Sequence, residues 1–297
     1  MCLVALALDS HPRFPLVIAA NRDEFFDRAA APLGWWRPRP GGAQILAGRD
    51  LHAGGTWMGL TREGRFALLT NVRDPARHDP AAPSRGGLVT DWLIGGQTLQ
   101  AFHEAHAGVA YNGFNLLAGD GREIHWWSNH PAASRENASS AESPCATSGD
   151  KTPFQRLEPG IHGLSNALLD TPWPKVTRLQ TRVRAALTQA LSANALIEDL
   201  FDALADPTPA PDDALPRTGV SVEWERWLSP AYIRTPDGRY GTRCSTVLVV
   251  EHTGSAARAT VVERTHPPYP SSGGRPVEQR HELADWPRRF STPDQPA

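Results

Sequence analysis

Residues 1–8 read Met1-Cys2-Leu3-Val4-Ala5-Leu6-Ala7-Leu8, a continuous apolar run that stops at Asp9. A short run of this kind is typical of a buried β-strand. A second apolar run at residues 15–20 follows a short turn, and the two runs together predict an antiparallel hairpin. Because an antiparallel strand returns to the place where its neighbour began, the end of the second run would lie beside Cys2.

Cys2 would carry both a thiol and a free α-amino group if Met1 is removed. The thiolate is the reactive form of cysteine, with an ordinary pKa of about 8.5, and a free α-amino group titrates near about 8. The amine can therefore accept the thiol proton at neutral pH without a separate histidine. The alternative is that Cys2 is a small buried hydrophobe, as free cysteines often are. Its position alone does not decide between the two.

Composition narrows the class of protein. The chain has 297 residues, a net charge of −2 and a pI of about 6.6, so nothing in its overall charge favours nucleic acid as a partner. Three cysteines without a CxxC pattern indicate reducing conditions and no disulfide framework. The first apolar run lacks the charged flank of a secretion signal, and no run approaches the roughly 18 apolar residues of a membrane helix. We therefore expect a cytoplasmic protein without integral membrane association.

Hydrophobic periodicity and turn residues predict the remaining elements. The predicted strands cover residues 56–60, 65–72, 115–118, 123–128, 240–251 and 258–264. The predicted helices cover residues 84–94, 99–107, 176–191 and 195–204. The predicted loops cover residues 132–152 and the proline-dense segment 206–216.

The order of these elements is strands, helices, strands, helices, strands, with antiparallel hairpins and no βαβ rhythm. It predicts an α+β domain in which helical layers cover antiparallel sheets. We place this single domain at residues 1–266 and expect a partly ordered tail at 267–297. No GxGxxG, Walker A or GxSxG pattern occurs, and we expect no cofactor. His103 and His106 are three residues apart, not four as in HExxH, so we expect an exposed helical face there and no metal.

Asn21-Arg22-Asp23-Glu24 directly follows the second apolar run. A cluster of this kind is most often a solvated turn. The hairpin would nevertheless bring it next to Cys2, where an arginine and a carboxylate could stabilise the thiolate and orient the ammonium group. The tetrapeptide thus favours a chemical role for Cys2.

Together with Met1-Cys2-Leu3-Val4, the tetrapeptide resembles the NRDE family, the transport and Golgi organisation protein 2 family, which is named after these four residues. Further blocks agree with the family pattern and follow in the expected order at residues 48–50, 54–59, 69–73, 111–116, 163–166, 173–175 and 240–246. Each block is weak alone, but together they are specific. More distantly, the chain is similar to the choloylglycine hydrolase and penicillin V acylase branch of the N-terminal nucleophile (Ntn) hydrolases. This resemblance implies a four-layer αββα sandwich and cleavage of a linear, non-peptide amide.

The resemblance also implies roles for individual residues. Cys2 would be the nucleophile that forms a thioester, Arg22 would lie beside the thiol, and Asp23 would hold the α-ammonium group. Because Arg22 and Asp23 are adjacent, they point to opposite faces of a strand. Either Glu24 takes the carboxylate role instead, or a β-bulge redirects one of the side chains.

The other implied site residues come from remote blocks. Asn71 and Asn166 would make the contacts to the oxyanion and the amino group, and Arg243 would close the site. The implied substrate contacts are Asn21, Glu24, Trp57 and Asn115.

Two functions fit this pattern. The first is an amidohydrolase that acts on a small or acylated amide through Cys2. The second is a non-catalytic protein that uses the same pocket to bind or carry a lipid, an acyl-CoA or haem, since the family is associated with lipid and acyl-CoA metabolism and with haem handling. Both predict the same fold.

Overall fold

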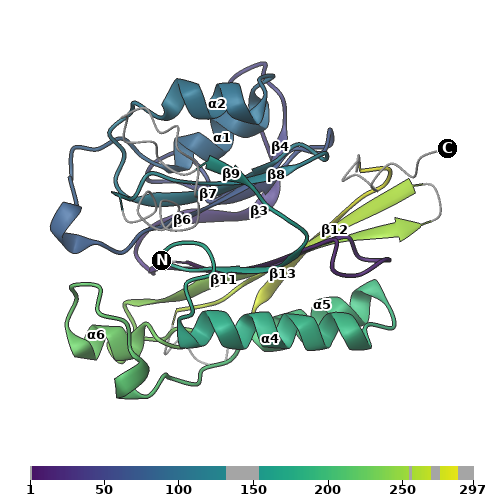
Figure 1. Cartoon of the computed structure of the whole chain (residues 1–297). Coiled ribbons are helices and arrows are strands. Elements are labelled where there is room, and N and C mark those ends of the chain that lie inside the picture. The colour runs from purple at the N-terminus through teal and green to yellow at the C-terminus, as the bar shows by residue number, and fades with distance from the viewer. Residues whose placement is uncertain (1, 132–153, 254–255, 269–274, 287–297) are drawn as a thin grey trace, which may run out of the picture.

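Two antiparallel sheets lie face to face in the computed structural model, and helices cover the outer side of each sheet (Figure 1). The structure describes residues 2–131, 154–253, 256–268 and 275–286. The order of layers is helices, sheet, sheet, helices, so the predicted αββα sandwich of the α+β class is confirmed.

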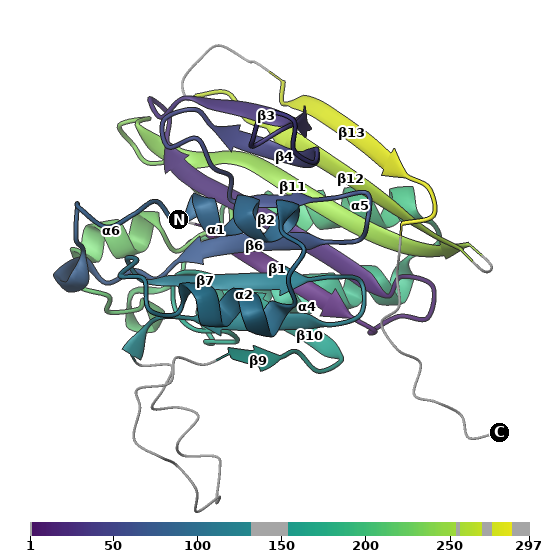
Figure 2. The same ribbon diagram turned by 90° about the horizontal axis from the view of Figure 1, so that it is seen from above.

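The six-stranded sheet has the strand order β10-β1-β2-β11-β12-β13. Its strands are β1 (Cys2–Leu8), β2 (Leu16–Phe25), β10 (Gly160–Leu164), β11 (Tyr240–Thr253), β12 (Ala256–Thr265) and β13 (Val277–Leu283). The first hairpin, β1 with β2, is antiparallel as predicted. Figure 2 shows β13 at one edge of this sheet.

The seven-stranded sheet runs in chain order from β3 to β9. Its strands are β3 (Ala30–Trp36), β4 (Ile45–Asp50), β5 (Met58–Leu60), β6 (Phe66–Asn71), β7 (Phe114–Gly119), β8 (Ile124–Ser128) and β9 (Phe154–Arg156). Helices α1 (Gly86–Ile94) and α2 (Leu99–His106) cover its outer face (Figure 1).

Helices α4 (Pro174–Gln189) and α5 (Ala193–Leu204) cover the outer face of the six-stranded sheet, and α6 (Val222–Trp227) lies beyond one end of this pair (Figure 1). Pro174 occupies the first turn of α4, as predicted, because that position needs no backbone N–H donor. The predicted apolar face of α4 is buried except for Leu191, which is 87% exposed because the helix ends at Gln189. Two short 3₁₀ turns, Pro75–Arg77 and Asp212–Ala214, complete the described helices.

The alternation of side chains along β1 decides where Cys2 points. Successive strand residues face opposite sides of a sheet. Val4 and Leu6 accordingly pack in the core between the two sheets, whereas Leu3 and Ala5 pack in the core under α4 and α5. Cys2 shares the even-numbered face, which is turned toward the seven-stranded sheet.

Several elements were not predicted. Strand β3 contains Pro32 and an irregular register between Ala31 and Gly34, which weaken its strand pattern and suit an edge strand. Strands β4, β9, β10 and β13 and helix α6 are also additions. Strand β13 lies within the segment that we expected to be a partly ordered tail, and the 3₁₀ turn at 212–214 interrupts the predicted loop.

Two further predictions concern the loop at 132–152 and His103. The loop predicted at 132–152 lies outside the described residues. His103 was expected on an exposed helical face, but its ring stacks on Phe154 of β9, with 4.5 Å between the ring centroids. Among the described helices, none combines the length and apolar character needed to cross a membrane.

Candidate active site

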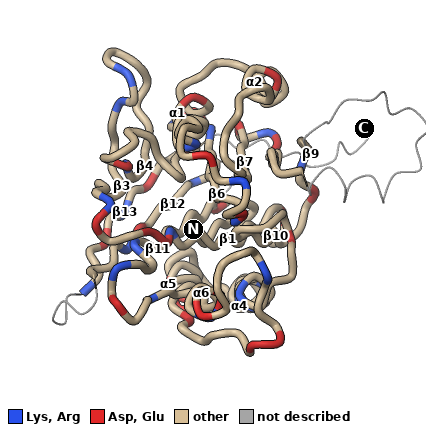
Figure 3. The backbone as a smooth tube through the Cα atoms, turned by 90° about the vertical axis from the view of Figure 1, so that its left-hand side faces the viewer, with Lys and Arg blue, Asp and Glu red and all other residues tan. Residues whose placement is uncertain are grey.

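Cys2, Arg22 and Cys244 lie side by side on three adjacent strands. In the register of the sheet, Cys2 of β1 is opposite Arg22 of β2, and Arg22 is opposite Cys244 of β11. Cross-strand partners share one face, so the guanidinium stands between the two thiols. Cys2 is 7% and Arg22 is 9% exposed. Figure 3 views the molecule from the left-hand side of Figure 1 and shows the N-terminus near the middle of that side, among the strands of the two sheets.

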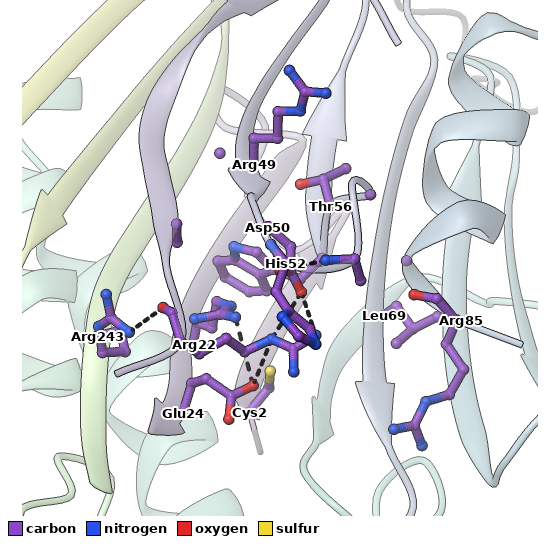
Figure 4. Close-up of a pocket in the computed structure, with 18 of the residues that line it drawn as sticks. Cys2, Arg22, Glu24, Arg49, Asp50, His52, Thr56, Leu69, Arg85 and Arg243 are labelled. Carbon is purple, nitrogen blue, oxygen red and sulfur yellow. Dashed lines mark hydrogen bonds and ion pairs between the residues drawn. The ribbon is translucent and has the colours of Figure 1, made fainter. Parts of the chain in front are cut away.

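A cavity of about 700 Å³ opens between the sheets at this point. The six-stranded sheet contributes residues 22–24 of the tetrapeptide and both cysteines to its wall, and the facing sheet and the start of α1 contribute the opposite wall (Figure 4). The lining residues that matter for the site are Cys2, Arg22, Glu24, Trp57, Asn71, Arg85, Arg243 and Cys244. A volume of this size suits a small-molecule ligand.

The surroundings of Cys2 favour the neutral thiol over the thiolate. Burial raises the pKa of the Cys2 thiol above its ordinary value, and the charges of Asp23 and Glu24 act in the same direction. The positive charge of Arg22 lowers the pKa. A neutral thiol is thus favoured near pH 7, and chemistry at this sulfur requires a base.

Arg22 makes one long ion pair among the described residues. In the described part of the chain its guanidinium makes no hydrogen bond, and its ion pair with Glu24 is long, with 3.6 Å between Nη2 and Oε2. Glu24 also approaches Arg28, and Arg28 holds Asp50 with two hydrogen bonds of 2.7 and 2.9 Å to Oδ2. This row of alternating charges joins the end of β2 to the end of β4.

Asp23 points away from Arg22, to the side of the sheet that α4 and α5 cover. Its Oδ1 accepts a 2.7 Å hydrogen bond from Thr242. The one bulge near the site is in β11, at Arg243, so β2 stays regular and the two adjacent residues remain on opposite faces. Burial raises the pKa of Asp23, and the charge of Lys175 lowers it.

Lys175 is a buried partner that we did not predict for the site, although it stands in one of the matched blocks. It is 2% exposed, and its Nζ donates a 2.9 Å hydrogen bond to the carbonyl of Leu228. Burial lowers the pKa of Lys175 to about 8, and the charge of Asp23 acts against this shift.

The two predicted asparagines have different positions. Asn71 ends β6 and lines the cavity, and its side chain makes no hydrogen bond to any residue that the structure describes. Asn166 is buried, and its Nδ2 donates a 2.8 Å hydrogen bond to the carbonyl of Asn71. The neighbouring Ser165 donates a 2.9 Å hydrogen bond to the carbonyl of Cys2. Residues 165 and 166 therefore tie the start of β1 to the end of β6.

Arg243 and Trp57 both line the cavity. The Arg243 guanidinium is engaged, because its Nη1 donates to the carbonyls of Phe25 and Arg28 at 2.7 and 2.9 Å. Figure 4 shows this side chain to one side of the Cys2 sulfur, beyond Arg22.

Asn21 and Asn115 lie in polar networks inside the protein. Asn21 donates to the carbonyls of Leu204 and Ala231 at 2.9 and 2.8 Å. Asn115 donates to the carbonyl of Ala167 at 2.8 Å and accepts a hydrogen bond from Trp126 at 3.1 Å. The fold therefore gathers Cys2 and most of the predicted site at the cavity, and uses these two amides elsewhere.

Comparison with known proteins places the chain in a family. Residues 1–268 match the family described as Transport and Golgi organisation 2. The chain belongs to this family. It is 33% identical to the Transport and Golgi organization protein 2 homolog of Bos taurus over 286 residues, covering 89% of this chain and 93% of the relative. It is 32% identical to the human homolog over 282 residues, with the same shares covered.

Two solved structures are similar at low sequence identity. A Caenorhabditis elegans N-acylethanolamine-hydrolyzing acid amidase ortholog has a TM-score of 0.45 and 10% identity, covering 84% of this chain and 92% of that chain. The C2A mutant of conjugated bile acid hydrolase from Clostridium perfringens has a TM-score of 0.44 and 10% identity, covering 95% and 92%.

Proposed function

We propose that this member of the Transport and Golgi organisation 2 family is an N-terminal cysteine amidohydrolase. Its substrate would be a linear, non-peptide amide of a small or acylated molecule. The observation that carries the proposal is the position of Cys2, whose side chain enters a cavity of about 700 Å³ beside the Arg22 guanidinium. We place this activity in the cytoplasm, where thiols stay reduced.

The reaction needs Met1 to be removed, so that Cys2 provides its own base. The Cys2 sulfur attacks the amide carbonyl while the thiol proton passes to the α-amino group. When the tetrahedral intermediate collapses, the C–N bond breaks, the amine leaves with that proton, and a thioester remains on Cys2. A water molecule, deprotonated by the same amino group, then cleaves the thioester to a carboxylic acid and returns the thiol.

The charged and polar neighbours have distinct proposed roles. Arg22 offsets the burial that raises the pKa of Cys2, because its charge favours the thiolate. Asn71 is the proposed oxyanion donor, since its carboxamide faces the cavity without another partner among the described residues. Asn166 positions Asn71 through the hydrogen bond to its backbone carbonyl.

Asp23 and Glu24 are the two candidates for the carboxylate that holds the α-ammonium group of Cys2. Glu24 is engaged with Arg22 and Arg28 in the row of charges along the cavity. Asp23 is held by Thr242 and directly follows Arg22, the residue opposite Cys2, the first residue of β1. We therefore propose Asp23 for this role, and Glu24 and Trp57 as substrate contacts in the cavity wall.

The competing function is binding without turnover, with a lipid, an acyl-CoA or haem in the same cavity. The raised pKa of the buried Cys2 thiol favours this alternative, because a neutral thiol is a poor nucleophile. If Met1 is retained, its peptide bond removes the free amine of Cys2 and with it the proposed base.

The test combines the state of the N-terminus with a trapped intermediate. Intact mass gives the fraction of chains that lack Met1, and this fraction is incubated with a panel of acyl-amides, lactams and acyl-CoAs. We expect an acyl adduct on Cys2 by peptide mass spectrometry, and none in Cys2→Ala. Cys244→Ser is the matched control, because it removes the other thiol of the same wall and should leave the adduct unchanged. Complete retention of Met1 would contradict the proposal, as would the absence of any adduct or product.

A further inference from the structure

Five arginines and five acidic residues line the cavity in the described part of the chain, so the formal charges balance, but the two signs are not evenly paired. Of the arginines that line it, Arg22, Arg49 and Arg85 make no hydrogen bond to a carboxylate in the described part of the chain. Asp50 is already held by the two hydrogen bonds from Arg28.

Glu263 lines the cavity as well, together with Asp23, Glu24 and Asp79. It accepts hydrogen bonds from the backbone N–H of Leu33 at 2.8 Å and from Thr246 at 3.2 Å. Burial raises the pKa of Glu263, and the hydrogen bonds from Leu33 and Thr246 act in the opposite direction. Arginines that lie in a concave wall without a hydrogen bond to a carboxylate favour an anionic ligand.

Arg85 brings this charge close to the reactive sulfur. Its guanidinium interacts electrostatically with Cys2 and Glu24, and its Nη1 donates a 2.8 Å hydrogen bond to the carbonyl of Gly113. Figure 4 shows Arg85 and Arg22 on opposite sides of Cys2. Arg22 is 9% exposed and makes no hydrogen bond to the described residues, so two guanidiniums flank one thiol.

The start of helix α1 adds to this wall. Arg85 is the residue before the first turn, and Ser84, Arg85 and Gly86 line the cavity. No side chain caps the first turn, and the N-terminal end of a helix favours negative charge. Gly55 permits this approach, because a Cβ on it would lie 2.6 Å from the carbonyl carbon of Gly86.

We propose that the substrate carries an anionic group, a carboxylate or a phosphate, close to the scissile amide, and that Arg85 and the start of α1 bind this group opposite Arg22. The inference rests on the proposed amidohydrolase function and names the class of its substrate. The sequence pattern does not indicate this site, because Ser84-Arg85-Gly86-Gly87 predicts only the beginning of a helix.

The test uses the Cys2 thiol as its own reporter. Alkylation rates of Cys2 are measured by peptide mass spectrometry with iodoacetate, which is anionic, and with iodoacetamide, which is neutral and of similar size. The iodoacetate-to-iodoacetamide ratio in the folded protein is divided by the same ratio in urea-unfolded protein. We expect this normalised preference to be about tenfold or more, and to fall about tenfold in Arg85→Gln. Both reagents need the thiolate, so a change in the thiol pKa alters the two rates alike and cancels in the ratio.

Two further variants locate the effect. Arg85→Lys keeps the charge and should keep most of the preference, which separates charge from a folding defect. Arg65→Gln is the matched control, because Arg65, like Arg85, donates from its guanidinium to backbone carbonyls, but Arg65 is not part of the cavity lining. It should leave both rates unchanged.

Protection experiments distinguish the two anion classes. Inorganic phosphate or acetate is added during iodoacetamide alkylation, and the anion that slows the reaction in the wild type but not in Arg85→Gln is the one that the site prefers. A normalised preference near one would overturn the inference, as would a preference that survives Arg85→Gln or a thiol that reacts with neither reagent.

These outcomes are independent of turnover, because alkylation needs neither amide cleavage nor removal of Met1. An anion preference without any hydrolysis would refute the proposed function and leave the anion site standing. Hydrolysis of neutral amides with no anion preference would refute this inference alone.

Discussion

Arg22 is the direct cross-strand neighbour of both Cys2 and Cys244, so one buried guanidinium separates the two described cysteines. The two thiols have different charged neighbours. Glu263 raises the pKa of Cys244 in addition to burial, whereas Arg22 lowers the pKa of both thiols. The two sulfurs therefore share a wall but not a chemical environment, and they can be compared within one protein.

Arg22→Gln should make Cys2 less reactive near neutral pH. Removing the adjacent positive charge raises the thiol pKa, and a rise of about one unit slows iodoacetamide alkylation roughly tenfold at pH 7. The measurement is the pH profile of Cys2 alkylation, whose midpoint should move to higher pH. Cys244→Ser should leave that midpoint in place. An unchanged midpoint in Arg22→Gln would show that Arg22 does not act on the thiol.

Asn71→Ala should impair turnover more than binding, if the proposed hydrolase function holds. Loss of one oxyanion donor typically lowers kcat by about 10²–10³, with little change in KM. Asn112→Ala is a suitable control, because Asn112 lines the same cavity but its side chain is paired with the backbone of Asp79. An equal loss in both variants would assign Asn71 a structural role.

Arg73→Met should destabilise the fold strongly. Arg73 and Glu225 form a buried ion pair of 2.8 Å, with side chains 6% and 3% exposed. Removing one partner of a buried pair costs about 3–5 kcal/mol, because the other charge is left without compensation. The measurement is the free energy of unfolding in urea.

The control for Arg73→Met is Arg226→Met, one residue beyond Glu225 in α6. Arg226 pairs with Asp212 on the exposed surface, where solvent screens the interaction. The free energy of unfolding should change little in this variant. Similar losses in the two variants would contradict the assignment of the stability to burial.

His266 should make the fold sensitive to mild acid. Burial lowers its pKa to about 4, and Arg234 and Arg264 act in the same direction. In the unfolded chain its pKa is about 6.5. Between these values the unfolded state binds more protons, so the contribution of His266 to stability is full above pH 6.5 and is lost as the pH falls toward about 4.

The size of this loss is up to about 3 kcal/mol, at about 1.36 kcal/mol per pKa unit. Urea unfolding of the wild type and of His266→Gln is compared at pH 7 and pH 5. The variant should show a smaller loss of unfolding free energy between the two pH values. Equal losses in both proteins would mean that other groups account for the acid sensitivity.

Trp286→Ala should show that the segment after β12 belongs to the fold. Trp286 is buried in the core between the sheets, and its Nε1 donates a 2.8 Å hydrogen bond to the carbonyl of Thr61. Truncating a buried tryptophan costs about 3–5 kcal/mol, which thermal unfolding would report. Val277→Ala, at an exposed position of β13, should stay within about 0.5 kcal/mol of the wild type.

Local patterns were sufficient for the elements whose side chains repeat with a clear period. The apolar runs of β1 and β2 and the apolar face of α4 identified their elements. A buried face needs apolar residues at a regular spacing, and this spacing is visible within a short stretch of sequence. Strands β9 and β13 carry weaker patterns, since one is short and the other is a largely exposed edge strand. Their pairing depends on neighbours that are remote in the sequence.

The sequence by itself determined that Cys2 begins a buried strand, that the tetrapeptide at 21–24 returns beside it, and that the chain has the family pattern. Only the tertiary structure decided that Asp23 and Lys175 lie behind the sheet, that Asn21 and Asn115 serve internal networks, and that Arg85, just before α1, interacts electrostatically with the thiol. The reason is physical: a strand's period sets which face a side chain takes, but the groups that meet it there come from segments whose approach depends on how whole layers pack.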